Sequence, residues 1–171
     1  MHAMRPRPEI TLGSSDISVR PLREGDIREI IEMSDLLGLS PWTRQDYLAE
    51  LRRKDSHLTI AQIDEQLTGF LAARRVPGPN DGVFDMEVYN IGVRPEHQRT
   101  GVGQVLMHDL IVFSRRNSVS DIWLEVRRKN SSAIAFYLSF GFAECGIRRG
   151  FYQHPSDDAV TMRLALGNRK S

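Results

Sequence analysis

Two glycines stand where an apolar strand-like segment gives way to a helix-like one. Gly101 and Gly103 lie in the segment 98–103 (QRTGVG), which follows the apolar run 88–93 and precedes apolar residues at helical spacing up to Phe113. A glycine loop that opens a helix presents unpaired backbone N–H groups at the positive end of the helix dipole. Glycine also lets a ligand come close to the backbone. The segment therefore predicts a site for a phosphate or a pyrophosphate, and a turn without a ligand is the alternative.

The segment differs from the two best-known phosphate-binding loops. No Gly-Lys-Ser/Thr follows it, so it is not a P-loop, and it lacks the third glycine of the dinucleotide fingerprint. The identity of the phosphate-bearing ligand is therefore indicated by other parts of the chain.

Glu125 is a candidate general base. It lies within the apolar run 122–126, which is typical of a buried central strand. A carboxylate in such a strand is costly to bury unless it is paired, and surroundings of this kind suit a base that works near neutral pH. The alternative is a carboxylate that pairs with an arginine such as Arg127 or faces water at the end of the strand.

Tyr137 is a candidate general acid. It follows Asn130 by seven residues, almost two helical turns, so both side chains project from one helix face. A phenol there could protonate a thiolate, and the alternative is a core tyrosine packed with Phe136 and Phe140. Asn130 is also a plausible N-cap of the helix.

These segments together resemble the GNAT N-acetyltransferases. Residues 90–103 resemble the strand, loop and helix that bind the coenzyme in this family, and residues 123–130 and 133–142 resemble the strand and helix that follow. Residues 147–152 (IRRGFY) and 41–43 (PWT) are similar to segments of the RimI-type ribosomal-protein-alanine N-acetyltransferases. The resemblance covers residues 16–166 and is densest from 87 to 152.

The resemblance implies acetyl transfer from the thioester of acetyl-CoA to an amine, with no metal. It assigns Glu125 as the proton acceptor, through water, and Tyr137 as the proton donor to the departing thiolate. The implied coenzyme contacts are Ile91, Gly92 and Val93 for the acetyl and pantetheine groups, Arg99, Thr100, Gly101, Val102, Gly103 and Gln104 for the pyrophosphate, and Asn130 for the pantetheine or phosphate region. A backbone amide near Val93 is the expected oxyanion donor, and Gly92 suggests a bulge or a close backbone approach.

Three further residues are candidates for the acceptor side. Glu87 would receive the substrate ammonium or act as a second base, or it is a strand carboxylate that faces solvent. Trp42 would wall the groove, or it packs onto the helix that follows it. Tyr152 would shape the acceptor side.

The pattern of apolar residues and turn formers predicts an α+β fold. Seven strands are expected at about 17–22, 57–64, 67–75, 83–93, 121–127, 142–152 and 159–166, with four helices at about 27–37, 43–51, 101–116 and 131–139. The sheet is expected to be mixed and mostly antiparallel, with one parallel crossover through the third helix. The GNAT resemblance adds that the strands at 83–93 and 121–127 splay around acetyl-CoA.

Composition excludes several other classes of protein. The 23 basic and 22 acidic residues nearly balance, which argues against a nucleic-acid-coating protein and so against DNA as a partner. One cysteine among 171 residues fits a reducing cytoplasm, and the five histidines form no pair with metal-ligand spacing. No apolar stretch approaches the ~20 residues that would span a membrane. Residues 1–15 are expected to be a disordered lead-in, 16–166 a single domain and 167–171 a frayed tail.

The sequence is thus interpreted as an acetyl-CoA-dependent N-acetyltransferase, a monomer or weak homodimer. Its expected acceptor is the N-terminal amine, alanine, of a ribosomal or other protein. The first alternative is the same fold acting on lysine or on a small amine. The second is a non-catalytic acyl-CoA-binding sensor.

Overall fold

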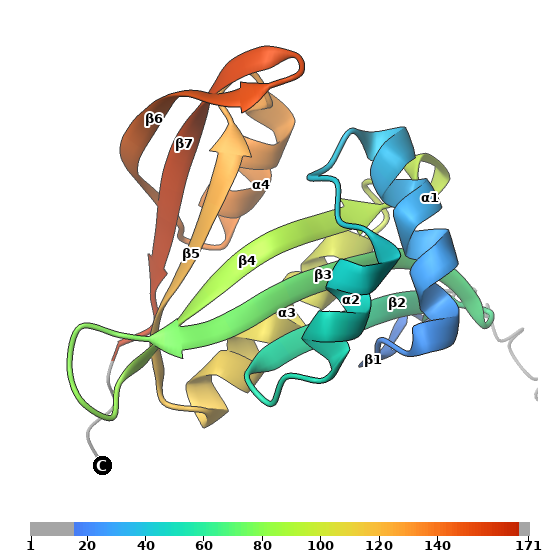
Figure 1. The fold of residues 1–171 in the computed structure, drawn as a ribbon, viewed down its shortest axis with the longest axis horizontal. Coiled ribbons are helices and arrows are strands. Elements are labelled where there is room, and N and C mark those ends of the chain that lie inside the picture. The colour runs from blue at the N-terminus through green and yellow to red at the C-terminus, as the bar shows by residue number, and fades with distance from the viewer. Residues whose placement is uncertain (1–15, 168–171) are drawn as a thin grey trace, which may run out of the picture.

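The computed structural model describes residues 16–167, so the expectations for residues 1–15 and 168–171 lie outside the described part of the chain. The strands and helices follow one another as β1 (Ser18–Pro21), α1 (Ile27–Leu37), α2 (Arg44–Leu51), β2 (Ser56–Ile63), β3 (Gln66–Pro77), β4 (Phe84–Val93), α3 (Val102–Arg116), β5 (Val119–Arg127), α4 (Ser131–Ser139), β6 (Ala143–Gln153) and β7 (Ser156–Ala165) (Figure 1). Within this part no helix is long and apolar enough to cross a membrane.

The strands form one seven-stranded sheet in the order β1-β2-β3-β4-β5-β7-β6. Every neighbouring pair is antiparallel except β4 and β5, which are parallel and joined through α3. The prediction of a mixed, mostly antiparallel sheet with one crossover through the third helix is therefore confirmed.

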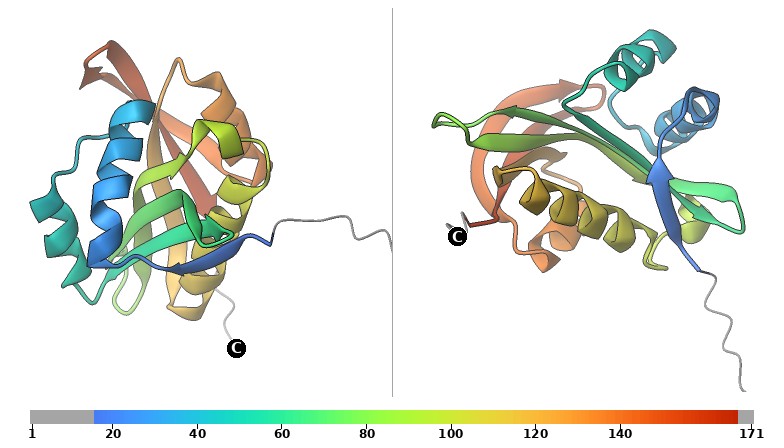
Figure 2. Two further views of the ribbon diagram at one scale, coloured as in Figure 1. Left: turned by 90° about the vertical axis from the view of Figure 1, so that its right-hand side faces the viewer. Right: turned by 90° about the horizontal axis from the view of Figure 1, so that it is seen from below.

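The helices cover the sheet on both faces. Helices α1 and α2 lie on one face, and α3 and α4 lie on the other (Figure 2). Each face has its own apolar core: Ile27, Ile30, Tyr47 and Phe70 are among the buried residues on the first, and Leu106, Leu110, Ile122 and Met162 on the second.

The parallel strands β4 and β5 separate before they end. Their ladder runs from Phe84 and Val119 to Val88 and Leu124. Beyond that pair, β4 continues to Val93 and β5 to Arg127 without pairing with each other. The strands β5, β7 and β6 consequently stand apart from β1–β4 (Figure 1). The predicted splay of these two strands is confirmed.

Local chemistry explains where the first helices begin and end. Gly38 ends α1 in the left-handed conformation at φ +63°, which glycine adopts without strain. Thr43 caps α2, because its hydroxyl accepts from the Asp46 N–H while the Asp46 carboxylate accepts from the Thr43 N–H. These ends fix the α1–α2 loop over the gap between β4 and β5.

The sequence suggests a bulge or a close backbone approach at Gly92 of β4, and the bulge lies three residues before it. The register with β3 shifts between Ala72 and Ala73, which leaves Tyr89 as the bulged residue rather than Gly92. Gly92 instead marks a close approach: a Cβ there would lie 2.9 Å from Phe70 and 3.0 Å from Leu39. A larger residue at this point of the strand would therefore require these side chains to shift.

Candidate active site

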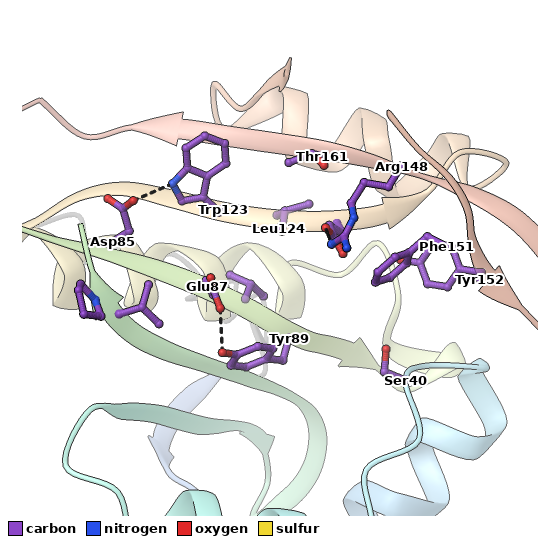
Figure 3. A pocket seen from close by; sticks show the side chains of 14 residues that line it. Ser40, Asp85, Glu87, Tyr89, Trp123, Leu124, Arg148, Phe151, Tyr152 and Thr161 are labelled. Carbon is purple, nitrogen blue, oxygen red and sulfur yellow. Dashed lines mark hydrogen bonds and ion pairs between the residues drawn. The ribbon is translucent and has the colours of Figure 1, made fainter. Parts of the chain in front are cut away.

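A groove of about 590 Å³ opens where β4 and β5 separate, on the face that carries the α1–α2 loop. Its walls come from the C-terminal end of β3, from β4, β5, β6 and β7, and from Ser40 in the loop (Figure 3). The lining residues that matter for the chemistry are Asp85, Glu87, Tyr89, Trp123, Glu125, Arg148, Phe151 and Tyr152.

Glu125 faces this groove from β5. The strand alternates, with Leu124 and Val126 buried and Trp123, Glu125 and Arg127 half-exposed. The prediction of a strand buried on both faces was therefore wrong, because the second face lines the groove instead of meeting a helix. The Glu125 side chain is 27 % exposed, and its Oε1 accepts a hydrogen bond of 2.5 Å from Nη1 of Arg148.

The arginine that pairs with Glu125 is thus Arg148 on β6 and not its strand neighbour Arg127. Arg127 donates to the carbonyl oxygens of Pro155 and His154, at 2.8 and 3.2 Å, and lies 4.1 Å from the centroid of the Tyr152 ring. It therefore positions the β6–β7 turn beside the groove.

The tip formed by β6 and β7 carries two aromatic residues of the groove. The β6–β7 register shifts between Arg148 and Tyr152, and Gly150 within this bulge has φ +61°. Its N–H donates to Oδ1 of Asp158 at 2.9 Å, which fixes the bulge. Tyr152 therefore turns into the groove beside Phe151, and burial, together with the charge of Glu125, raises the pKa of Tyr152.

Glu87 lies on the groove floor and is held by the bulged Tyr89. The Tyr89 hydroxyl donates to Oε2 of Glu87 at 2.9 Å (Figure 3). Burial, and then the carboxylate of Glu87, raise the pKa of Tyr89 to about 12. The Arg74 guanidinium lies 5.3 Å from the ring centroid and is itself paired with the buried Glu50. The phenol therefore stays protonated and keeps donating to Glu87.

Asp85 and Trp123 extend the groove and were not among the predicted site residues. Oδ2 of Asp85 accepts from the Trp123 indole N–H at 3.1 Å, and burial raises the pKa of the Asp85 carboxyl. The signal was present, because Asp85, Glu87 and Tyr89 alternate along one strand, as residues on a single exposed face do.

Tyr137 does not line the groove. Its ring lies in the core between α4 and the sheet, 5.4 Å from that of Phe136 and 5.7 Å from that of Phe142. Burial raises the pKa of Tyr137, with a smaller contribution from the nearby Tyr152. The phenol is thus protonated at neutral pH, which a proton donor requires. The position of the ring also agrees with the alternative, a tyrosine that packs in the core.

Trp42 packs between the second helix and the groove wall. Its ring lies 5.1 Å from that of Tyr47 and 5.5 Å from that of Tyr89, and it is not among the groove-lining residues. These contacts agree with the alternative in which Trp42 packs onto the helix that follows it, α2.

The glycine loop has the geometry of an anion cradle. Gly101 has φ +98° and Arg99 has φ +61°, so the chain turns tightly into α3. The first helical bond is from the Val105 N–H to the Gly101 carbonyl at 3.0 Å, which leaves the N–H groups of the first turn without helical partners. Thr100 and Gln98 fix the loop through hydrogen bonds to the carbonyl oxygens of His97 and Val93. The loop therefore fits a pyrophosphate.

Two further predicted coenzyme contacts, Val93 and Asn130, lie at the end of β4 and at the start of α4. The Arg94 N–H donates to the Thr68 carbonyl on β3 at 2.8 Å, and by alternation the Val93 N–H points to the other side, where β5 has separated. Asn130 caps α4, with Oδ1 accepting from the Ala133 N–H at 3.1 Å. Among residues 16–167 no group of three or more potential metal ligands comes together.

Three comparisons relate this chain to known proteins. Residues 26–142 match the model of the acetyltransferase (GNAT) family. The chain is 32 % identical to N-alpha-acetyltransferase RimI of Mycobacterium tuberculosis over 93 % of its own length and 99 % of the relative's. It is 42 % identical to the ribosomal protein bS18-alanine N-acetyltransferase of Escherichia coli over 74 % of its length and 82 % of the relative's.

Solved structures of similar fold include a ribosomal-protein N-acetyltransferase and a protein in complex with acetyl-CoA. The crystal structure of the ribosomal-protein-S18-alanine N-acetyltransferase from Escherichia coli superposes with a TM-score of 0.77, at 25 % identity, over 91 % of this chain and 99 % of that one. NAA60 of Arabidopsis thaliana in complex with acetyl-CoA superposes with a TM-score of 0.78, at 17 % identity, over 88 % and 98 %, which shows the shared fold.

Proposed function

Because this chain belongs to the GNAT family of acetyltransferases, we propose that it transfers the acetyl group of acetyl-CoA to the N-terminal amine, alanine, of a protein. The observation that carries the proposal is one juxtaposition. The glycine loop leads from β4 into α3, the groove opens on the side of the α1–α2 loop where β4 and β5 separate, and Glu125 faces that groove. A thioester held in the gap would meet an amine held in the groove.

The coenzyme would be held by the residues that border the gap. The first-turn N–H groups of α3, with Arg99, Thr100, Gly101, Val102, Gly103 and Gln104, would bind the pyrophosphate. Ile91, Gly92 and Val93 would run beside the pantetheine arm, and Asn130 would border it from α4. When bound, acetyl-CoA supplies an activated acetyl group on sulfur.

The transfer needs three protein groups. Glu125 takes a proton from the acceptor ammonium, through water, so that the neutral amine forms the new C–N bond. The Val93 N–H hydrogen-bonds to the oxyanion that develops on the acetyl carbonyl. The C–S bond then breaks, and Tyr137 gives its proton to the departing thiolate. The transfer is direct: Cys145 is exposed on β6, is not among the groove-lining residues, and has no acid or base partner within the described chain.

The shape of the groove supports a peptide acceptor over a small one. It is bounded by the α1–α2 loop and the β6–β7 tip, and it extends past Glu125 to Glu87, Trp123 and Asp85. The names of the relatives point to α-amines and, in Escherichia coli, to a ribosomal protein. A ribosomal acceptor would place the reaction in the cytoplasm.

Acetyl transfer to a peptide panel tests the proposal, with mass spectrometry locating the modified nitrogen. The panel contains alanine-first peptides, the same peptides with a blocked N-terminus and a free lysine, and small amines. Acetylation of the α-amine is expected. Transfer confined to lysine or to small amines would move the acceptor to the first alternative. No transfer in the presence of bound acetyl-CoA would favour the sensor and overturn the proposal.

A further inference from the structure

The ion pair between Arg148 and Glu125 occupies the carboxylate that the acceptor amine needs. Nη1 of Arg148 lies 2.5 Å from Oε1 of Glu125, and no described residue donates to Oε2. In the proposed function, on which this inference rests, the acceptor enters as an ammonium and gives its proton, through water, to the same carboxylate. Two cations therefore compete for Glu125.

Arg148 is the member of the pair that can move. Its side chain is 59 % exposed against 27 % for Glu125, and exposed ion pairs are weak. Its guanidinium also lies 4.6 Å from the centroid of the Phe151 ring, on the tip that borders the groove. It can thus leave Oε1 and remain over the ring, because the cation–π contact does not depend on the carboxylate.

Other guanidinium groups around the groove are committed elsewhere. Arg74 is paired with Glu50, Arg163 with Asp121, and Arg127 is bound to the carbonyl oxygens of the β6–β7 turn. Asp85 and Glu87 accept from the neutral donors Trp123 and Tyr89. Arg148 is therefore placed to respond when a new cation reaches Glu125.

A peptide N-terminus offers the displaced guanidinium a new partner. The first residue of a peptide carries a carbonyl oxygen three bonds from its α-amine, whereas a lysine ε-amine or a simple alkylamine has none at that distance. With the amine at Glu125, this carbonyl would lie beside the position that Arg148 now occupies. A guanidinium donates readily to such an oxygen.

We infer that Arg148 determines specificity for α-amines: it covers Glu125 in the free enzyme and moves to the first carbonyl oxygen of the acceptor when the α-amine and its bridging water reach Glu125. An acceptor without that carbonyl must displace the guanidinium and gains nothing in return. Arg148 thus disfavours amines that lack a neighbouring carbonyl.

The test compares one acceptor that carries this carbonyl group with one that lacks it, and each variant is compared with the wild type on the same acceptor, so that the different basicities of the two amines cancel. Alaninamide and isopropylamine share the same substituted carbon, and only alaninamide carries the carbonyl. Arg148→Gln should lower kcat/KM for alaninamide and for an alanine-first peptide about fivefold or more, since a hydrogen bond from a charged donor is lost. It should leave kcat/KM for isopropylamine unchanged or raise it by up to about fivefold, the value of an exposed ion pair. Arg148→Lys keeps the positive charge but replaces the planar guanidinium with an ammonium, so its kcat/KM for alaninamide should lie between those of the wild type and Arg148→Gln.

Arg149→Gln is the matched control, because Arg149 is the exposed next residue of the same bulge and makes no ion pair within the described chain. Arg149→Gln should leave kcat/KM for alaninamide and for isopropylamine unchanged. An equal fall for both acceptors in Arg148→Gln, with acetyl-CoA affinity and melting temperature retained, would overturn the inference and leave the proposed function standing. A wild-type protein that acetylates none of the acceptors would overturn both.

Discussion

Val88 on β4 and Leu124 on β5 are the last partners of the parallel ladder, and beyond them the two strands have no common hydrogen bonds. The candidate groups lie around this point. Glu125 follows Leu124 directly and faces the groove, while the amides of β4 up to Val93 border the gap. The glycine loop begins a few residues further on, at the start of α3.

Glu125→Gln should lower kcat roughly 10²- to 10⁴-fold, the usual contribution of a general base. Acetyl-CoA affinity, measured by calorimetry, should stay within about twofold, because Glu125 lies on the acceptor side. Glu144→Gln, an exposed carboxylate on β6, is the control and should retain full activity. A Glu125→Gln protein within a few-fold of the wild type at neutral pH would rule out Glu125 as the base.

Tyr137→Phe should lower kcat by roughly 10²-fold while the melting temperature changes little, because the ring keeps its contacts with Phe136 and Phe142. Burial raises the pKa of Tyr137, so its hydroxyl remains a proton donor throughout the neutral range. Single-turnover rates would separate this loss from product release. If the variant keeps its turnover, the tyrosine serves packing alone.

Gly101→Val should weaken acetyl-CoA binding by roughly tenfold or more. Gly101 has φ +98°, where a β-branched residue is strained by about 1–3 kcal/mol, so the loop would leave its conformation to relieve the strain. Gly146→Val is the control, since a Cβ at Gly146 meets no atom within 4 Å and its φ lies outside the left-handed region. Equal calorimetric affinities for the two variants would contradict the phosphate-loop assignment.

His57 should make the fold less stable in mild acid. Its side chain is 11 % exposed, lies 4.2 Å from the Phe113 ring and binds Oδ2 of Asp109 at 3.0 Å. Burial lowers the pKa of His57, against the opposite effect of Asp109. The unfolded chain therefore binds this proton more readily than the folded one. The His57 contribution is complete above the unfolded pKa of about 6.5 and is lost as the pH falls toward the folded value.

Urea unfolding at pH 7.5 and 5.5 measures this effect above the range where most carboxylates titrate. The wild type should lose more free energy of unfolding between the two values than His57→Phe does. His108→Gln, an exposed histidine on the same helix as Asp109, should behave as the wild type. Identical losses in the wild type and His57→Phe would show that the ring does not contribute.

Features that depend on neighbours in sequence were predictable from the sequence. Gly38, Thr43 and Asn130 end or cap helices through their own backbone or side-chain chemistry, and the structure has them in those roles. The glycine loop and the crossover strands are likewise local patterns. The splay of β4 and β5 came from the family resemblance, because no residue pattern in either strand encodes it.

Features that depend on distant pairing were not predictable. Arg148 meets Glu125 only because β7 lies between β5 and β6 and the bulge at Gly150 turns the strand. From the sequence, Arg127 was the nearer candidate. The half-exposed face of β5 was not predicted for a related reason. Trp123 counts as an apolar residue of a buried strand, although its indole N–H donates to Asp85 on the neighbouring strand. Strand β7 begins at Ser156, before its apolar residues, because β6 supplies its hydrogen bonds there.

The early end of the β4–β5 ladder leaves backbone groups of two adjacent strands without the partners that a closed sheet would give them. In the proposed function, acetyl-CoA supplies some of those partners, and a ligand that binds only the folded state stabilises it in proportion to the logarithm of its concentration. The free energy of unfolding of this protein would therefore rise with the concentration of its own acetyl donor. The acetyl donor would then act as a substrate and as a stabiliser of the fold at the same time.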